Sequence, residues 1–259
     1  MAERKILIAG GGTGGHLFPA LAIGEEIHRR EPNAMIHYVG SNFGLEARVF
    51  PVKDVWHTLL PIRGFQRGLS LQSLGRNMLL PTRIIRSMLK MRSLLLDFLP
   101  EVVVGTGGYA SALPLYMASR KAEPLPIILQ EQNSFPGVTT RWFAKKAKTI
   151  CIAFKEANDY LERETVLTGN PIRQGIENGL RENAEKEFNL NPDHQTIFLF
   201  GGSQGSAYLN KMMNKVVNNI AGTGLQVLWQ TGDLEYLKYK NQDSDNIRGI
   251  PFIHNMADA

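Results

Sequence analysis

Short apolar runs alternate along this chain with longer stretches in which apolar and polar positions recur at helical spacing. The short runs predict strands at residues 4–9, 35–39, 55–60, 101–105, 126–130, 148–152 and 164–168. The longer stretches predict helices at 16–30, 71–97, 110–120 and 137–146. Strands that alternate with helices are typical of an α/β protein whose parallel sheet is covered on both faces.

The alternation breaks at "TGNPIRQG" and then starts again. The second half repeats the same order, with "TIFLF" as a buried strand, "GGSQGSA" as a glycine turn, "YLNKMMNKVVNNI" as a helix and "LQVLWQ" as the next strand. We therefore expect two Rossmann-like domains, residues 1–168 and 169–259, hinged at residues 169–173. Their glycine turns would face a cleft, because ligands of open α/β sheets bind at the carboxyl ends of the strands.

The first strand runs into five glycines within the six residues 10–15. Glycine accepts positive φ and lets a ligand approach the backbone, and the start of a helix favours an anion. The spacing of Gly10, Gly12 and Gly15 satisfies the dinucleotide fingerprint, but that fingerprint also needs an acidic residue at the end of the second strand. That strand ends in Gly40 and Ser41 instead, so an NAD site is disfavoured.

Composition limits the remaining chemistry. The chain has 259 residues, 43% of them hydrophobic and 20% charged, with Cys151 as its single cysteine. There is no Cys/His cluster at metal-site spacing, so we expect no metal and no cofactor. No stretch reaches the ~18 apolar residues of a membrane span. The net charge of +5 favours an anionic partner.

The basic excess is concentrated between residues 63 and 92. This segment holds no acidic residue and seven basic ones among leucines and methionines, namely Arg63, Arg67, Arg76, Arg83, Arg86, Lys90 and Arg92. A basic amphipathic segment suits an anionic membrane surface. A core helix with an arginine-rich outer face is the alternative. Nucleic acid is not expected as a partner, because no recognised binding signature is present.

Five motifs together carry a resemblance to a known family. The segments "GGGTGGHLFPALA", "GTGGYASALP", "LQEQNSFPG", "GNPIR" and "GGSQGSAYLN", in this order, resemble the MurG family of bacterial N-acetylglucosaminyltransferases. The resemblance implies a GT-B fold and an inverting transfer of GlcNAc from UDP-GlcNAc to the MurNAc C4 hydroxyl of lipid I, which yields lipid II. It also implies roles in peptidoglycan synthesis, cell shape and cell division, and a peripheral position on the cytoplasmic face of the bacterial inner membrane.

The resemblance also assigns residues to the two substrates. UDP-GlcNAc would contact Thr13, Gly14, Gly15, Asn133, Arg173, Ser203 and Ile253. The acceptor side would include Gly107, Gly108 and Tyr109. Family members are longer, so we expect the second domain of this chain to be incomplete. The alternative function is an inactive fragment that only binds a nucleotide sugar or a lipid precursor.

An inverting transfer needs a base that removes the proton of the attacking hydroxyl. His16 directly follows the first glycine turn, and a histidine pKa suits this role near pH 7. His16 could instead cap the helix or bind a phosphate. Glu131 is the rival base, with a structural carboxylate as its alternative role. The D-x-D pattern at Asp243 and Asp245 lies in a polar run and indicates a solvated loop rather than a metal site.

Overall fold

The computed structural model describes residues 3–64, 78–202, 204–220 and 223–259. The chain divides into two compact units, Met1–Arg173 and Gln174–Ala259, which are described separately below. The predicted boundary at residue 169 and the predicted hinge at 169–173 stay predictions. Gly169 adopts a φ of +75°, a conformation that favours glycine.

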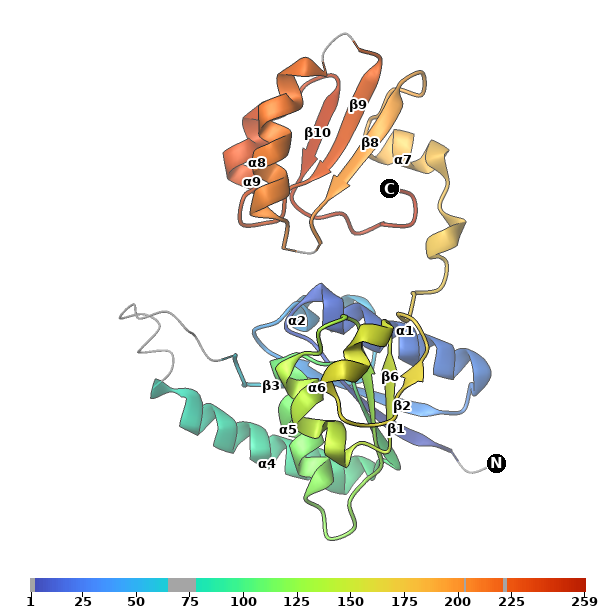
Figure 1. Cartoon of the computed structure of the whole chain (residues 1–259), viewed down its shortest axis with the longest axis vertical. Coiled ribbons are helices and arrows are strands. Elements are labelled where there is room, and N and C mark those ends of the chain that lie inside the picture. Colours follow the sequence, from blue (N-terminus) through green and yellow to red (C-terminus); the bar gives the residue numbers. More distant parts are fainter. Residues whose placement is uncertain (1–2, 65–77, 203, 221–222) are drawn as a thin grey trace. The chain divides into compact units, whose positions relative to one another are not determined.

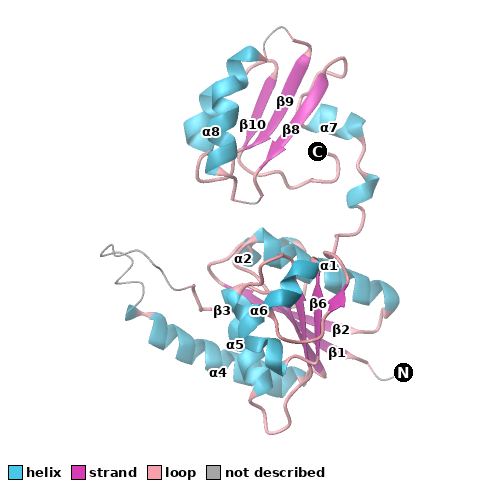
Figure 2. Ribbon diagram, viewed as in Figure 1, coloured by secondary structure: helices cyan, strands magenta, loops and turns pink. Residues whose placement is uncertain are grey.

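The first unit is built on one parallel sheet (Figures 1 and 2). Its seven strands follow the order β3-β2-β1-β4-β5-β6-β7. Their bounds are β1 (Lys5–Ala9), β2 (Met35–Ser41), β3 (His57–Leu60), β4 (Val102–Gly105), β5 (Ile127–Glu131), β6 (Thr149–Ile152) and β7 (Val166–Leu167). The order reverses direction between β1 and β4, and ligands of open α/β sheets bind at such a switch point.

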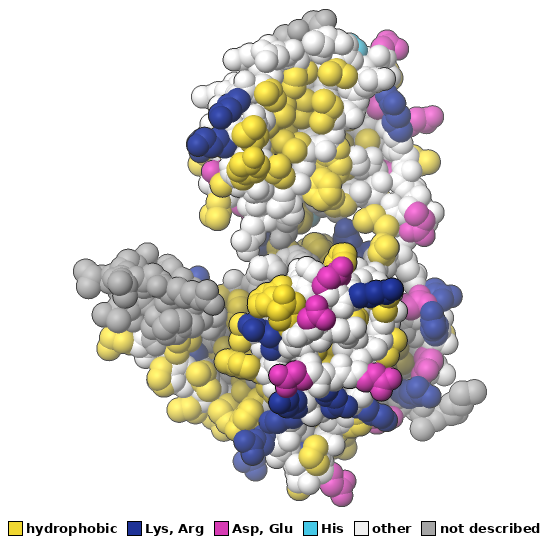
Figure 3. Space-filling view, in the orientation of Figure 1, with side chains coloured by type: hydrophobic (Ala, Val, Ile, Leu, Met, Phe, Trp, Pro, Cys, Tyr) yellow, Lys and Arg dark blue, Asp and Glu magenta, His cyan; other side chains and the backbone are white. Residues whose placement is uncertain are grey.

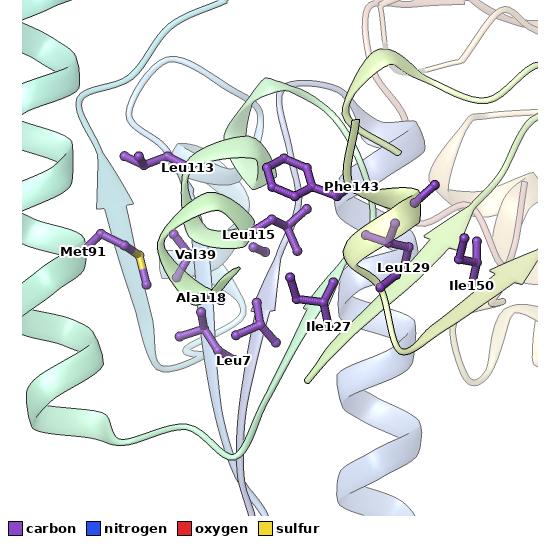
Figure 4. Close-up of a cluster of buried hydrophobic side chains, with 14 of the residues drawn as sticks. Leu7, Val39, Met91, Leu113, Leu115, Ala118, Ile127, Leu129, Phe143 and Ile150 are labelled. Atoms are coloured by element: carbon purple, nitrogen blue, oxygen red, sulfur yellow. The ribbon is translucent and has the colours of Figure 1, made fainter. Parts of the chain in front are cut away.

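Helices cover both faces of this sheet. They are α1 (Gly14–Arg30), α2 (Glu46–Val52), α4 (Leu80–Phe98), α5 (Tyr109–Ser119) and α6 (Val138–Phe143), with 3₁₀ turns at Ala144–Lys146 and Lys155–Tyr160. Alternate residues of β1 enter different cores, as the period of a strand requires. Leu7 packs with Met91 of α4 and Leu115 of α5 (Figure 4), whereas Ile6 and Ile8 pack on the side of α1 and α2.

The second unit contains a smaller parallel sheet in the order β10-β9-β8. Its strands are β8 (Gln195–Phe200), β9 (Leu225–Gln230) and β10 (Ile247–Ile250), and its helices are α7 (Arg181–Glu187), α8 (Ala207–Val216) and α9 (Tyr236–Tyr239). Short 3₁₀ turns lie at Ile176–Asn178, Val217–Asn219 and Lys240–Gln242. Trp229 packs with Met213 of α8, while Leu228 packs with Phe188 and Ile253. Again, neighbouring residues of one strand enter two cores.

The α/β class with two parallel sheets is confirmed, and all seven predicted strands of the first half are present. The predicted helix at 71–97 is observed as α4 from Leu80 onward, and residues 71–77 lie outside the described part. Helix α1 begins two residues earlier than predicted, which places His16 in its first turn. Helices α2 and α9 and strand β10 were not predicted, because each is short and has no distinct apolar period.

Candidate active site at the carboxyl end of the first sheet

Two glycine turns meet where β1 and β4 end. Ala9 and Gly105 are paired residues of these neighbouring strands, so the turns that follow them lie side by side. The amide of Thr106 donates to the Ala9 carbonyl at 3.0 Å. Its hydroxyl donates to the His16 carbonyl at 2.7 Å. These bonds tie the start of α1 to the turn after β4.

The imidazole of His16 lies against that second turn. A Cβ atom on Gly107 would stand 2.8 Å from His16 Cδ2, and one on Gly108 would stand 3.2 Å from Nδ1 and 2.2 Å from the Gly11 carbonyl oxygen. Both glycines also have positive φ, +94° and +76°. The bare backbone at these two predicted acceptor residues therefore makes room for His16 and for the first turn.

The chemistry of His16 suits a proton acceptor. Its Nδ1 lies 3.1 Å from the Thr13 hydroxyl. Burial lowers the pKa of His16 below its usual value, although the nearby Glu131 carboxylate opposes this change. The imidazole is therefore neutral near pH 7, and the Thr13 bond orients the ring. Among the described residues no hydrogen bond to Nε2 is found, so that nitrogen is the one available to a substrate.

A buried carboxylate that the sequence analysis missed occupies the first turn. Glu46 is fully buried, and its two oxygens accept the amides of Gly12 and Ser41, each at 2.8 Å. A Cβ atom on Gly11 would stand 2.4 Å from the Glu46 carboxyl carbon, and one on Gly44 would stand at the same distance. The glycine turn, which we expected to favour an external anion, thus has its Gly12 amide bonded to an internal one.

The signal for Glu46 was present in the sequence. The dinucleotide fingerprint requires an acidic residue at the end of the second strand, and Glu46 stands five positions after Ser41. It follows the loop that contains Gly44 and begins α2. Its carboxylate turns back toward the strand end rather than toward a ribose.

The other glycines of the first turn divide into two groups. A Cβ atom on Gly10 would collide with the Thr106 side chain, and one on Gly12 would stand 2.7 Å from the Tyr109 ring. Gly15 is exposed, and a Cβ atom there would approach nothing closer than the Thr13 hydroxyl at 3.8 Å. Packing within the protein explains Gly10 and Gly12, whereas Gly15 faces open space.

Glu131 orders the loop that follows β5. Its Oε1 accepts the backbone and side-chain amides of Asn133, at 3.1 and 2.9 Å, and its Oε2 accepts the Gly137 amide at 3.0 Å. Gln132 in the same loop donates to the Thr106 carbonyl at 2.8 Å. Because both oxygens of Glu131 already accept protein donors, its geometry matches the structural role better than the base role.

The remaining predicted donor residues are spread over both units. In the first unit, the Arg173 guanidinium lies 4.4 Å from the ring centre of Phe18 on α1. In the second unit, the Ile253 amide donates to Gln230 Oε1, and Gln230 Nε2 donates to the Gly202 carbonyl, each at 2.8 Å. Only the carbonyl of Ile253 could therefore bind a nucleoside. Ser203 lies outside the described residues.

The described residues contain no group of His, Cys, Asp and Glu side chains that could hold a metal ion. The D-x-D segment forms a turn before β10, where Asp243 accepts the Gly249 amide at 2.5 Å. This bond gives Asp243 a local structural role. The described part of the site thus offers the His16 imidazole for the chemistry.

Family models match both units of the chain. The N-terminal domain of glycosyltransferase family 28 matches residues 6–152, and the C-terminal domain of the same family matches residues 196–259. The match thus spans both glycine turns.

Two similar bacterial proteins are described as UDP-N-acetylglucosamine–N-acetylmuramyl-(pentapeptide) pyrophosphoryl-undecaprenol N-acetylglucosamine transferases. The protein of Christiangramia forsetii is 37% identical over 97% of this chain. That of Bacillus subtilis is 35% identical over 98%. The chain spans 68% and 70% of their respective lengths.

Solved structures share the fold. The crystal structure of MurG from Acinetobacter baumannii has a TM-score of 0.62 at 22% identity, and the match covers 99% of this chain and 70% of that one. Os79 from O. sativa, solved with U2F and trichothecene, has a TM-score of 0.64 at 13% identity over 97% of this chain and 73% of its own.

Proposed function

Because this chain belongs to glycosyltransferase family 28, we propose that it transfers N-acetylglucosamine from UDP-N-acetylglucosamine to lipid I in peptidoglycan synthesis. The observation that carries this proposal is the 37% identity to a transferase of that description over 97% of the chain. The alternative of an inactive binding fragment is less well supported, because the similar proteins are described as enzymes and His16 is oriented for proton transfer.

The proposed reaction is a single displacement at the anomeric carbon. The C4 hydroxyl of the acceptor attacks C1 of GlcNAc, the bond from C1 to the diphosphate oxygen breaks, and UDP leaves with the electron pair. His16 Nε2 takes the hydroxyl proton. A neutral imidazole is required for this step, and the burial of His16 favours that form.

The residues proposed for the donor sugar lie in the first unit. Thr13, Gly14 and Gly15 would lie against the sugar, and the open surroundings of Gly15 support this placement. Asn133 is exposed, and its side-chain amide bond to Glu131 leaves its oxygen directed elsewhere.

In the second unit, the diphosphate would lie at the turn before α8, at Ser203, and the Ile253 carbonyl would face the nucleoside. Gly202 in this turn adopts a φ of +80°, and a Cβ atom there would meet nothing within 4 Å. The ten-residue helix α8 directs its positive end toward the same turn. A departing diphosphate would be stabilised there without a metal ion.

The acceptor would lie beside Gly107, Gly108 and Tyr109. The two glycines already face His16 and Gly11, so their contribution would be to position the base. Tyr109 begins α5, and burial raises the pKa of its hydroxyl, which keeps the phenol neutral. The neutral phenol donates to Ser41 Oγ at 3.3 Å.

A product assay tests the function. The chain, supplied with UDP-GlcNAc and lipid I, should release UDP and glycosylate the acceptor in equal amounts, as measured by mass spectrometry and a coupled UDP assay. Omitting the acceptor should abolish UDP release. UDP release without glycosylated acceptor, or saturating binding of both substrates without any product, would contradict the proposal.

We further propose that the outer face of α4 docks on an anionic membrane surface at the cytoplasmic side of the inner membrane. Figure 3 shows hydrophobic side chains gathered over this helix. They include the exposed Ile84, Ile85, Leu89 and Leu96, with Arg86, Lys90 and Arg92 between them. No helix among the described residues is long and apolar enough to cross a membrane. Arg67 and Arg76 of the predicted basic segment lie outside the described residues.

Reversing two charges on this face should weaken membrane binding. Each basic residue near an anionic surface contributes about 1 kcal/mol, so Arg86→Glu with Arg92→Glu should lower binding to phosphatidylglycerol vesicles at least about tenfold. The binding should also fall with added salt, since screening acts over about 8–10 Å at 0.10–0.15 M. Vesicle sedimentation measures both effects.

The matched control is Lys148→Glu, an exposed charge directly before β6 on a different part of the same unit. This variant should bind vesicles nearly as the unchanged protein does. Equal losses in the two variants would show that net charge, and not the α4 face, governs the attraction.

A further inference from the structure

Two arginines share one aromatic ring at the carboxyl edge of the first sheet. The Cζ atoms of Arg63 and Arg83 lie 5.0 and 4.9 Å from the ring centre of Phe43. Phe43 follows β2, Arg63 follows β3, and Arg83 lies in the first turn of α4. Three segments that are distant in sequence therefore converge on this point.

The backbone that carries Phe43 and Arg63 is held in place by one hydroxyl. Ser41 Oγ donates to the Ile62 carbonyl at 2.6 Å and accepts the Phe43 amide at 3.0 Å. It also accepts the Tyr109 hydroxyl at 3.3 Å. These bonds fix the backbone at Ile62 and Phe43, and they therefore restrict the positions of the Arg63 and Phe43 side chains.

The two positive charges lack a counter-ion within the described part of the chain. No ion pair of Arg63 or Arg83 is found there, and Nη1 of Arg83 is buried without a hydrogen-bond partner among those residues. The buried Glu46 carboxylate of the neighbouring glycine turn already accepts two backbone amides. A buried donor without an acceptor is costly and is rare in native proteins.

We propose that Arg63 and Arg83 form a binding site for a diphosphate group, which in the proposed function is the diphosphate of the lipid-linked acceptor. Planar guanidinium groups match phosphate oxygens with paired hydrogen bonds, and the Phe43 ring restricts their motion. A phosphate oxygen would supply the acceptor that Arg83 Nη1 lacks. The identity of the ligand rests on the proposed function, whereas the anion site rests on the geometry alone.

The position of this site fits an acceptor that reaches His16. The Tyr109 hydroxyl donates to Ser41 Oγ, and the Tyr109 ring packs against Gly12. The adjacent Gly108 packs against the His16 ring. A diphosphate on the two arginines would therefore lie on the same edge of the sheet as the proposed base. The arginines of α4 differ in their surroundings, because Arg83 turns toward Phe43 while Arg86 is exposed on the helix.

Titration with inorganic pyrophosphate tests the anion site. Calorimetry is carried out with excess UDP present and again without UDP. Pyrophosphate binding that UDP abolishes is assigned to the proposed donor site. Arg63→Gln and Arg83→Gln should each weaken the UDP-insensitive binding about tenfold or more, the scale of a hydrogen bond to a charged group. Arg86→Gln, one turn further along the same helix, is the control and should leave this binding unchanged.

Unchanged binding in both variants, or an equal loss in Arg86→Gln, would overturn the proposal. Circular dichroism of each variant confirms that it remains folded. A chain that forms no transfer product but loses pyrophosphate binding in Arg63→Gln and Arg83→Gln would retain the anion site and reject the proposed function. These two failures are thus distinguishable.

A second measurement identifies the source of the diphosphate. Arg83→Gln should raise KM for the lipid-linked acceptor about tenfold or more while KM for UDP-GlcNAc stays unchanged. Its binding to phosphatidylglycerol vesicles without acceptor should match that of the unchanged protein. If Arg83→Gln instead lowered vesicle binding far more than Arg86→Gln did and left the acceptor KM unchanged, the site would hold a lipid headgroup, and the proposal would be wrong.

Discussion

His16→Ala is expected to lower kcat by about 10²–10⁴-fold while KM for either substrate changes little, because general base catalysis contributes on this scale. The imidazole lies in the first turn of α1, held by the Thr13 hydroxyl and packed on Gly107. A general base interacts with the transferring proton mainly in the transition state, so its loss lowers kcat more than it changes substrate binding. Steady-state kinetics with UDP-GlcNAc and lipid I measures both constants.

The pH dependence follows from the direction of the pKa change. Burial lowers the pKa of His16 from the usual 6.5, so the neutral form predominates at pH 7 and above. As the pH falls through the lowered pKa, the imidazole gains a proton and cannot act as a base. The activity should therefore decline on the acid side, below pH 6.5, and His16→Ala should remove that limb of the profile.

Two variants make this prediction decisive. His28→Ala changes an exposed histidine in the last turn of the same helix and should leave kcat unchanged. If His16→Ala kept near-normal kcat, Glu131 would be the next residue to test, although its three protein donors argue against it. A raised KM with unchanged kcat would instead identify His16 as a phosphate ligand.

Glu46→Ala is expected to lower the free energy of unfolding by about 3–5 kcal/mol. The change leaves the buried Ser41 amide and the partly buried Gly12 amide without an acceptor, and each such loss costs about 1–3 kcal/mol. It also opens a cavity beneath Gly11 and Gly44, which lack side chains where the carboxylate lies. Urea unfolding of the variant and the unchanged protein measures the difference.

A second glutamate supplies the control. Glu26 bonds Arg29 and Arg30 on the surface of α1, where water competes for all three groups. Glu26→Ala should therefore change the unfolding free energy far less than Glu46→Ala. Equal effects of the two substitutions would mean that the Glu46 carboxylate does not hold the first glycine turn.

The elements of the first unit were largely predictable from local pattern. The run at residues 6–9 is apolar on both faces because β1 lies in the middle of a covered parallel sheet, and such a strand needs no distant information to be recognised. The glycine turn after it was predictable for the same reason. Helix α2 was not, because its seven residues contain Pro51 and form no apolar period.

The site was predictable in composition but not in arrangement. The sequence alone determined that a histidine follows a glycine turn at a strand end, since both features are local. Only the tertiary structure decided what occupies the space that each glycine leaves. Glu46 fills the space at Gly11, 35 positions away in the printed sequence, and His16 fills the space at Gly107.

The arrangement could not be predicted because a glycine in the sequence indicates only that a side chain is absent. Whether a substrate or another part of the protein uses the resulting space depends on contacts between segments far apart in the chain, such as the Thr106 bond to His16 across 90 positions. The same holds for charge. The basic run at residues 63–92 was visible in the sequence, but only the fold turned Arg83 toward Phe43 and left Arg86 on the surface.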